Sequence, residues 1–419
     1  MINRRHFLGS TAGLLVDAAE SNPQIKAARD AAMAVLKPSE KDLRHGLELH
    51  AQSLVVESYG FSPRSAIDGA AIRRAVEAGA SALELEDLNT EMLLMRVADD
   101  PSQRPEYEQA WKASGVTCIL QNAGEEGTSP LRLMKRLAHF TYLTDKLRGI
   151  VSRAAVPADI EAARQAGRHC LYLTGNGVPL AQEWNSTVEE LAYVRLFYQL
   201  GIRMMHLTYN RRNPLGDGCA EPANGGLSEL GRAAIAEMNR LGIIVDVAHS
   251  GWRTSLEAAK ASSKPMVASH SAAVEMRRHI RAKPDEVIRA IADTGGYVGV
   301  YSVASFLGRS GDLNAMLDNI EYLVKKFGAD HVAIGTDLAY IPSTANAQWK
   351  LVGPRPKSRV RYEYLWPPGA LGNESHPSLA WINWPMFTVG MVQRGIGDED
   401  IRKILGGNVM RVAKAALPV

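Results

Sequence analysis

Short apolar runs rich in β-branched residues recur along this chain, and amphipathic helical segments separate them. Near-continuous apolar strands that alternate with helices predict a parallel sheet buried on both faces. Eight of them in one chain predict a (β/α)8 TIM barrel. A doubly wound open sheet is the alternative, but no GxGxxG follows the first run, so a dinucleotide site has no support. The runs lie at 54–58, 116–120, 170–174, 204–208, 243–248, 265–269, 296–302 and 331–336.

Two segments interrupt this alternation. Residues 65–114 predict extra helices after the first strand, and residues 338–375, rich in Pro, Gly, Trp and Tyr, predict a long loop after the eighth. Both emerge where barrels build their active sites. We expect residues 41–419 to form one barrel domain, preceded by a leader and N-terminal extension over residues 1–40.

The first residues, MINRRHFLGSTAGLLV, resemble a twin-arginine export signal, with Arg4 and Arg5 before a short apolar stretch. They predict a periplasmic or secreted protein, and an ordinary basic N-terminus of a cytoplasmic protein is the alternative. No later stretch reaches the roughly 18 to 20 apolar residues that span a bilayer.

The composition and charge of the chain limit which classes of binding partner are expected. The chain has 419 residues, 46% hydrophobic and 22% charged, with a net charge of +3, so neither nucleic acid nor an anionic membrane is indicated. The three cysteines form no CxxC pair, and their odd number excludes a fully paired disulfide framework. Cys118 and Cys170 lie in apolar strands, whereas Cys219 lies in a glycine-rich loop. The oligomeric state stays open, with a homodimer as one option.

The chemistry is expected at the strand ends. His249 closes IIVDVAHS and His270 closes PMVASHS one short helix later, so the two imidazoles converge on one face and can share a metal ion. Asp337, after the last strand, would accept a proton from water that the metal activates, as in many barrel amidohydrolases. The alternative is polar side chains that only satisfy hydrogen bonds. The residues after the strands are Tyr59, Phe61, Asn122, Thr174, Asn176, Tyr209, His249, His270, Tyr301 and Asp337.

Four stretches carry a family resemblance: GLSELGRAAIAEMNRLGIIVDVAHSG, PMVASHSAAVEMRRHIRAKPDEVIRAIADTGGYVGV, HVAIGTD and ILGGNVMRV. In order, spacing and wording they resemble the membrane (renal) dipeptidases, a family of zinc metallopeptidases. The resemblance implies an amidohydrolase-like (β/α)8 barrel that binds two zinc ions and hydrolyses dipeptides, or the amide of β-lactams in some members. It makes His249 and His270 ligands of one zinc, Arg281 the binder of the substrate carboxylate, and Asp337 the acid/base group.

The first half of the barrel departs from the family pattern. Tyr59 and Phe61 stand where the family has a ligand His and a ligand Asp, and Thr174 or Asn176 stands at the bridging Glu. Two cations a few ångströms apart need several carboxylates, including a bridge. We therefore expect at most one metal ion, zinc, on the side of His249 and His270, or none.

A catalytic zinc takes about three protein ligands. The third would come from Asp337, or from Cys219 or Glu221 in the loop NRRNPLGDGCAEPANGG, unless that loop is only a solvated surface segment.

The remaining strand-end residues are assigned to substrate. Tyr59 and Tyr209, the latter in place of a substrate-contacting His, either hydrogen-bond a developing oxyanion or fill vacated volume. Asn176 and Tyr301 are expected to contact substrate beside Arg281.

These assignments predict a dipeptidase-like hydrolase of small carboxylate-bearing amides. The competing hypothesis is a metal-free relative that binds a peptide-like molecule or assists its maturation.

Overall fold

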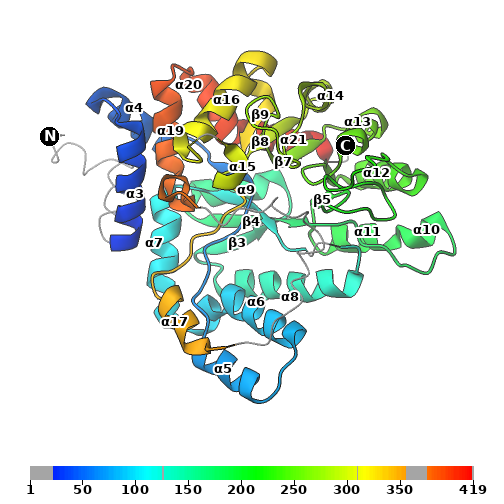
Figure 1. The fold of residues 1–419 in the computed structure, drawn as a ribbon, viewed down its shortest axis with the longest axis horizontal. Coiled ribbons are helices and arrows are strands. Elements are labelled where there is room, and N and C mark those ends of the chain that lie inside the picture. Colours follow the sequence, from blue (N-terminus) through cyan, green and yellow to red (C-terminus); the bar gives the residue numbers. More distant parts are fainter. Residues whose placement is uncertain (1–21, 125–126, 309, 355–374, 418–419) are drawn as a thin grey trace.

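A parallel sheet lies at the centre of the structure, a computed structural model that describes residues 22–124, 127–308, 310–354 and 375–417 (Figure 1). Within these residues the sheet has nine strands. They are β1 (Val56–Gly60), β2 (Cys118–Asn122), β3 (Val151–Ala154), β4 (His169–Gly175), β5 (Met204–His206), β6 (Ile244–Asp246), β7 (Val267–Ser271), β8 (Tyr297–Val300) and β9 (Val332–Ile334).

Eight of these strands form the predicted barrel. They follow the order β1-β2-β4-β5-β6-β7-β8-β9, and every paired neighbour is parallel. The two edges meet through backbone hydrogen bonds from Phe61 N to Leu338 O (3.1 Å) and from Asp337 N to Tyr59 O (3.2 Å). The predicted (β/α)8 architecture is confirmed, and each predicted run overlaps one barrel strand.

The ninth strand, β3, was not predicted from the sequence. It pairs with the first half of β4, over Val151 to Ala154, whereas β5 pairs with the end of β4. Its Ser152 and Arg153 are only partly buried or exposed, so the segment shows no continuous apolar run. A strand outside the barrel keeps one side in water and lacks the pattern that marks the others.

Helices between the strands surround the barrel (Figure 1). Their amphipathic faces pack on the outside of the sheet, as expected for α/β proteins. They are α8 (Pro130–Lys146), α9 (Pro157–Gln165), α10 (Thr187–Glu190), α11 (Ala192–Gln199), α12 (Glu229–Leu241), α13 (Trp252–Ala261), α14 (Asp285–Asp293), α15 (Ala304–Leu307), α16 (Leu313–Phe327) and η2 (Ala329–His331).

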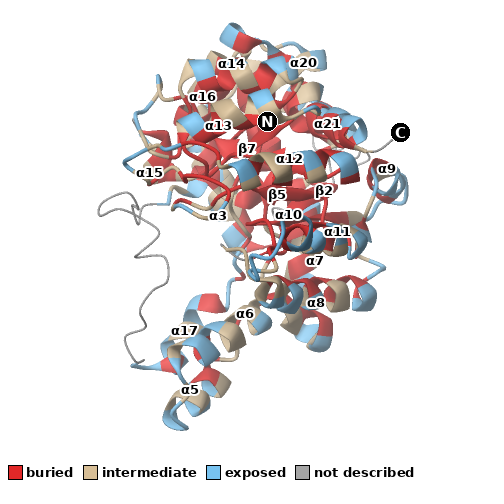
Figure 2. Ribbon diagram, turned by 90° about the vertical axis from the view of Figure 1, so that its right-hand side faces the viewer, coloured by how far each residue is buried: buried red, intermediate tan, exposed pale blue. Residues whose placement is uncertain are grey.

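The predicted extra helices after the first strand are present as α5 (Gly69–Glu77), α6 (Ala82–Asp99), η1 (Pro101–Gln103) and α7 (Arg104–Ser114). The segment predicted as a loop, 338–375, contains helix α17 (Ala345–Val352), and residues 355–374 lie outside the described part. Helix α17 packs against α5, and both project from one end of the molecule (Figures 1 and 2). Here Ile67, Ile72, Leu85 and Val352 form a small hydrophobic cluster of their own.

The chain ends contribute further helices. They are α3 (Pro23–Leu36), α4 (Glu40–Gln52), η3 (Pro377–Leu379), η4 (Trp381–Asn383), α19 (Trp384–Gln393), α20 (Asp398–Arg402), the π-helical η5 (Lys403–Gly407) and α21 (Asn408–Ala416). Helix α4 packs along α19, and α21 contacts β1, β6 and β9. Among the described residues, no helix is both long and apolar enough to cross a bilayer.

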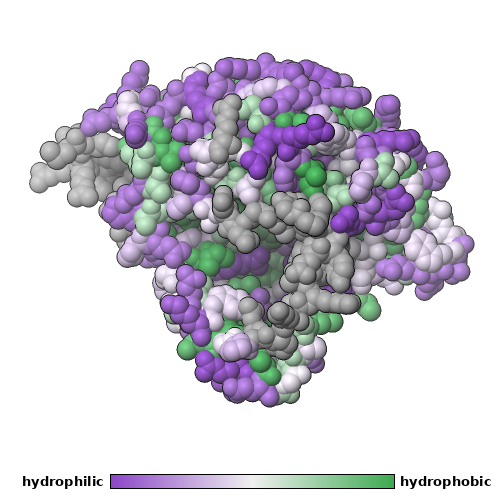
Figure 3. All heavy atoms as spheres, viewed as in Figure 1, coloured by the Kyte–Doolittle hydropathy of each residue, from purple (hydrophilic) through white to green (hydrophobic). Residues whose placement is uncertain are grey.

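The core lies inside and around the barrel. Side chains alternate along each strand, so one set fills the interior and the other packs under the helices. Cys118 and Cys170 belong to the interior cluster, which also includes residues of α21, and both are fully buried as expected. Figure 2 shows buried residues concentrated at the strands, and Figure 3 shows hydrophilic residues over much of the outer helices.

Candidate metal and substrate site

The carboxyl ends of β6 and β7 bring His249 and His270 together. A register shift in β7 between Ala268 and Ser271 inserts one extra residue, so Ser269 and His270 both reach interior side chains. The Nε2 atoms of His249 and His270 lie 3.0 Å apart, with 3% and 0% of the two residues exposed. The predicted convergence of these two imidazoles is present in the structure.

The outer nitrogen of each ring is already bonded. Nδ1 of His249 lies 2.7 Å from Asn210 Oδ1, and Nδ1 of His270 lies 2.8 Å from Ser269 Oγ, whose own hydroxyl donates to Asp246. Each ring therefore carries its proton on Nδ1 and turns the lone pair of Nε2 toward the other ring. Two facing lone pairs repel, and a cation between them removes that repulsion, so the pair fits a metal ion.

The charge state of the pair agrees with this geometry. Burial, followed by the charge of Arg281, holds the pKa of His249 and of His270 well below its usual range. Both rings are neutral at pH 7 as a result. Neutral imidazole is the form that binds metals.

Arg281 lies behind the histidine pair, on the loop after β7. Its residue is 1% exposed, its Nη2 donates to the carbonyl of His270 (3.0 Å), and its Nε has no hydrogen-bond partner. Lys283, also fully buried, donates through Nζ to Ser250 O (2.6 Å). No Asp or Glu of the described segments forms an ion pair with either cation. Two buried cations without a counterion suit an anionic ligand such as a carboxylate.

Residues 116–347, more than half of the chain, match the sequence model of the family described as membrane dipeptidase (peptidase family M19). This chain belongs to the membrane dipeptidase family. An uncharacterized dipeptidase of Schizosaccharomyces pombe is 35% identical over 160 residues, which cover 36% of this chain and 38% of that protein. The dipeptidase tcpJ of Claviceps purpurea is 26% identical over 226 residues, 53% of this chain and 46% of that protein. The chain therefore spans less than half the length of these two curated relatives.

A solved structure covers more of the fold. An amidohydrolase from Pseudomonas aeruginosa superposes with a TM-score of 0.65 at 26% identity, over 88% of this chain and 98% of that one. The family and this likeness support a metal-dependent hydrolase. They do not favour the metal-free binding protein that was the competing hypothesis.

In this dipeptidase-family chain, aromatic rings stand at Tyr59 and Phe61, the two positions where the resemblance predicts ligands. Tyr59 stacks on His270 with ring centroids 3.9 Å apart and donates its hydroxyl to Asn176 Oδ1 (2.5 Å). Phe61 carries the guanidinium of Arg64 over its ring, 5.0 Å from the centroid. Phe61 cannot bind a second zinc, because a phenyl ring offers no donor atom, and the hydroxyl of Tyr59 is bonded to Asn176.

The other departures also have identified contacts. Thr174 is buried and donates to the carbonyl of Gln121 (3.2 Å), so Asn176, rather than Thr174, reaches toward Tyr59. Tyr209 stacks on His249 with centroids 4.0 Å apart. Tyr301 is buried and lies against Phe306, whose carbonyl its hydroxyl contacts at 3.4 Å. The roles assigned to these residues stay predictions.

The three residues proposed as a third ligand lie in different surroundings. Cys219 Sγ is 3.2 Å from Asn210 Oδ1, the atom that also contacts His249, and burial raises the pKa of its thiol. Glu221 accepts from the backbone of Arg212 (3.1 Å) in the outer loop. Asp337 follows β9 with φ at 60°, a left-handed backbone that is uncommon for a residue other than glycine. Such outliers concentrate at functional sites.

A different ligand cluster was missed from the sequence. Among the described residues, one group of three ligand-type side chains lies with its donor atoms within 4.8 Å of one another: His206, Asp246 and His270, all buried. Cys219, Glu221 and Asp337 are not part of it. The signal was a histidine inside the apolar run MMHLT and an aspartate inside IIVDVA. Both residues lie at the last position of their strands, and inward-facing positions there reach the site as well as the residues that follow the strands.

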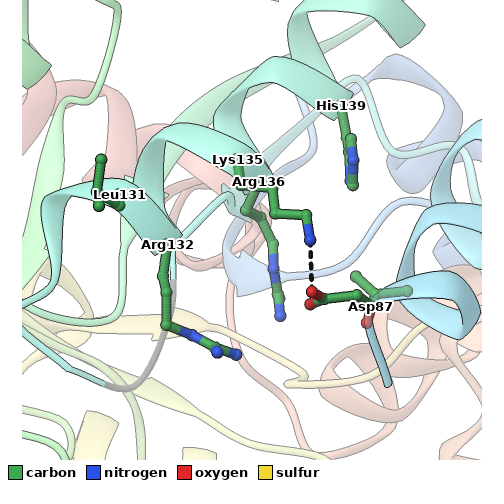
Figure 4. Close-up of a pocket in the computed structure, with 7 residues that line it drawn as sticks. Asp87, Leu131, Arg132, Lys135, Arg136 and His139 are labelled. Carbon is green, nitrogen blue, oxygen red and sulfur yellow. Dashed lines mark hydrogen bonds and ion pairs between the residues drawn. The ribbon is translucent and has the colours of Figure 1, made fainter. Parts of the chain in front are cut away.

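Two cavities open on the described part of the protein. One of about 170 Å³ lies between α6 and α8 and is lined by Arg132, Lys135 and Arg136, with an ion pair between Lys135 and Asp87 (Figure 4). None of the predicted site residues lines it. A larger cavity of about 580 Å³ is bordered by 302–304 after β8, 338–341 after β9, and helix α3.

Proposed function

We propose that this protein hydrolyses the amide bond of a dipeptide, or of a related small carboxylate-bearing amide, with at most one metal ion. The observation that carries the proposal is the pair of neutral imidazoles whose Nε2 atoms face each other at 3.0 Å beside the buried Arg281. Membership of the dipeptidase family supports the same reaction class.

His249 and His270 would hold the ion, and zinc is the metal that the family implies. A zinc ion there would supply Lewis-acid chemistry, polarising the amide carbonyl and lowering the pKa of water. The facing imidazoles fit one ion, whereas Tyr59 and Phe61 provide no second set of ligands.

The chain's own residues would complete the reaction. Arg281 would bind the substrate carboxylate, because its guanidinium is buried and no described carboxylate neutralises it. Asp337 would accept a proton from the attacking water and return it to the leaving amine. Tyr209 or Tyr59 would donate to the developing oxyanion.

A dipeptide panel tests this proposal. Wild-type protein is expected to hydrolyse at least one dipeptide, to lose the activity with a chelator, and to regain it with zinc. His270→Ala is expected to lose about 10³-fold or more in kcat/KM, because a lost ligand removes the metal. His331→Ala removes an imidazole that only contacts Gly296 O outside the site and should keep full activity.

Metal content gives a second readout of the same proposal. Elemental analysis of the purified protein is expected to find no more than one zinc per chain. Two stoichiometric ions, or dipeptide hydrolysis that His270→Ala leaves unchanged, would contradict the proposal.

We also propose that the protein is exported to the periplasm. Arg4 and Arg5 lie outside the described residues, and their twin-arginine-like context supports export to the periplasm, with the cytoplasm as the alternative. A homodimer is compatible with this function. Fractionation of cells that express the chain, with Arg4→Lys and Arg5→Lys together as the comparison, tests export.

A further inference from the structure

We propose that His206 and Asp246 join His270 as ligands of a single divalent transition-metal ion. The inference rests on the proposed function for the place of the metal and deepens it by naming the ligand set. In this set the imidazole at the last residue of β5 and the carboxylate at the last residue of β6 replace the ligands that the resemblance predicts after β1 and β4 and that this chain lacks.

The three side chains form a compact, water-excluded cluster. One nitrogen of each imidazole and one carboxylate oxygen lie within 4.8 Å of one another, and the residues are at most 1% exposed. His206 Nε2 and Asp246 Oδ2 lie 2.8 Å apart. Ligands of a tetrahedral zinc lie about 3.3 Å from one another, since zinc–ligand distances are about 2.0–2.1 Å. Small side-chain rotations therefore suffice to close the cluster around one ion.

The surroundings of His206 support its role as a metal ligand. Nδ1 of His206 makes no hydrogen bond, although the side chain is fully buried. Nε2 lies 2.8 Å from Asp246 Oδ2, an ion-pair contact, so these two donor atoms already lie together. A buried polar atom without a partner destabilises the folded protein, and binding to a metal removes that cost.

The rings of three histidines are spaced as a shared ion requires. Their centroids are 5.0 Å apart for His249 and His270, 5.3 Å for His206 and His249, and 5.4 Å for His206 and His270. Three imidazoles on one tetrahedral zinc have centroids about 5 Å apart, because each centroid lies just over 1 Å behind its nitrogen. His249 is thus placed beside the three proposed ligands, and a catalytic zinc that takes it as a fourth donor has to expand to five ligands when water or substrate binds.

The donor set selects the class of metal. Imidazole nitrogens with one carboxylate suit zinc or ferrous iron, whereas magnesium and calcium prefer oxygen ligands. A purely structural role for His206 is the competing account. In it, a chain of contacts from His206 through Asp246 and Ser269 orients His270 without any metal.

Binding measurements on the full chain decide between the two accounts. Protein stripped with a chelator is titrated with Zn²⁺ by calorimetry and with Co²⁺ by visible absorption. His206→Asn is expected to lower zinc affinity at least 10-fold and to change the Co²⁺ spectrum. His50→Asn is the matched control, because His50 is also buried but bonds to Thr388 and Ser114 far from the cluster. Unchanged affinity and spectrum in His206→Asn overturn the inference.

A conservative variant covers the case in which His206→Asn fails to fold. His206→Cys offers a thiolate at the same position, so coordination would add a sulfur-to-cobalt charge-transfer band, and absence of that band in folded, Co²⁺-loaded protein overturns the inference. The two proposals fail separately. Metal-dependent dipeptide hydrolysis with normal zinc affinity in His206→Asn refutes only the ligand set. Binding that depends on His206, without hydrolysis of any dipeptide, refutes only the proposed function.

Discussion

Lys283 shows what burial does to a single residue next to the site. Its amino group is enclosed, and burial lowers its pKa from 10.5 to about 7. An unfolded chain keeps the higher value, so the folded form binds fewer protons between pH 7 and 10.5. Stability therefore rises with pH through this window, and the cost of the buried charge is fully present below pH 7.

Lys283→Met is expected to stabilise the protein at neutral pH, and the gain should shrink by about 2 kcal/mol between pH 7 and pH 9, since one pKa unit corresponds to 1.36 kcal/mol. Loss of the bond to Ser250 O offsets part of the gain without changing its pH dependence. Urea unfolding at the two pH values measures both effects. Lys260→Met, at an exposed position of α13, should show no such dependence; equal gains for Lys283→Met at both pH values would refute this account.

At the scale of elements, the bulge in β7 depends on glycines in the neighbouring strands. A Cβ added to Gly299 of β8 would lie 2.0 Å from the carbonyl of Ser269, and one added to Gly335 after β9 would lie 2.2 Å from the same oxygen. The close packing of Gly299 and Gly335 against this carbonyl fixes the backbone of Ser269, which directly precedes His270. The bulge therefore depends on three segments at once.

Gly299→Ala is expected to destabilise the protein by about 2–4 kcal/mol, in the range of strong overpacking and backbone displacement. It should also weaken zinc binding, because His270 moves with Ser269. Gly149→Ala is the control, since nothing lies within 4 Å of the added methyl group. Thermal unfolding and zinc titration of both variants check the prediction, and a stable Gly299→Ala protein with normal zinc affinity would contradict it.

The elements that the sequence predicted share one physical property. Each barrel strand is buried on both faces and therefore shows an apolar run, whereas β3, partly in water, shows none. Helix α17 was not predicted, because its segment is rich in Pro, Gly and aromatic residues and this composition favours a loop. Tertiary contact with α5 stabilises it there.

The same reasoning explains the candidate site. His249 and His270 were predictable because they end apolar runs. His206 and Asp246 lie within such runs, and only the barrel's curvature brings their inward faces together. The β7 bulge, which places His270, has no sequence signature apart from glycines on other strands. A strand register that depends on distant residues cannot be read from one segment.

At the scale of the whole molecule, helix α3 packs on the outer helical layer of the barrel, against η3, η4, α16 and α19. Ile25 and Ala32 are fully buried, and Arg29 donates to the carbonyls of Ala113 (3.1 Å) and Ile382 (3.2 Å). The helix also borders the larger cavity. The boundary at residue 40 stays a prediction, but the packing ties α3 to the barrel.

Deleting residues 1–39 is expected to destabilise the barrel by several kcal/mol, because burying one large aliphatic side chain alone contributes about 1.5–3 kcal/mol. Deleting residues 1–21, which leaves α3 and its cap at Asn22 in place, is expected to change stability little. Urea unfolding of the two truncations gives the comparison. Equal stability of both proteins would show that α3 does not support the barrel.

The left-handed backbone at Asp337 has an evolutionary consequence. A glycine would adopt this conformation without steric cost, so selection for folding alone would favour the loss of the carboxylate at the end of β9. A single substitution of Asp337 by glycine would remove the carboxylate and relieve the backbone strain. A lineage that kept the barrel without the proposed reaction is therefore expected to exchange this aspartate for glycine readily and to keep the barrel shape without the carboxylate.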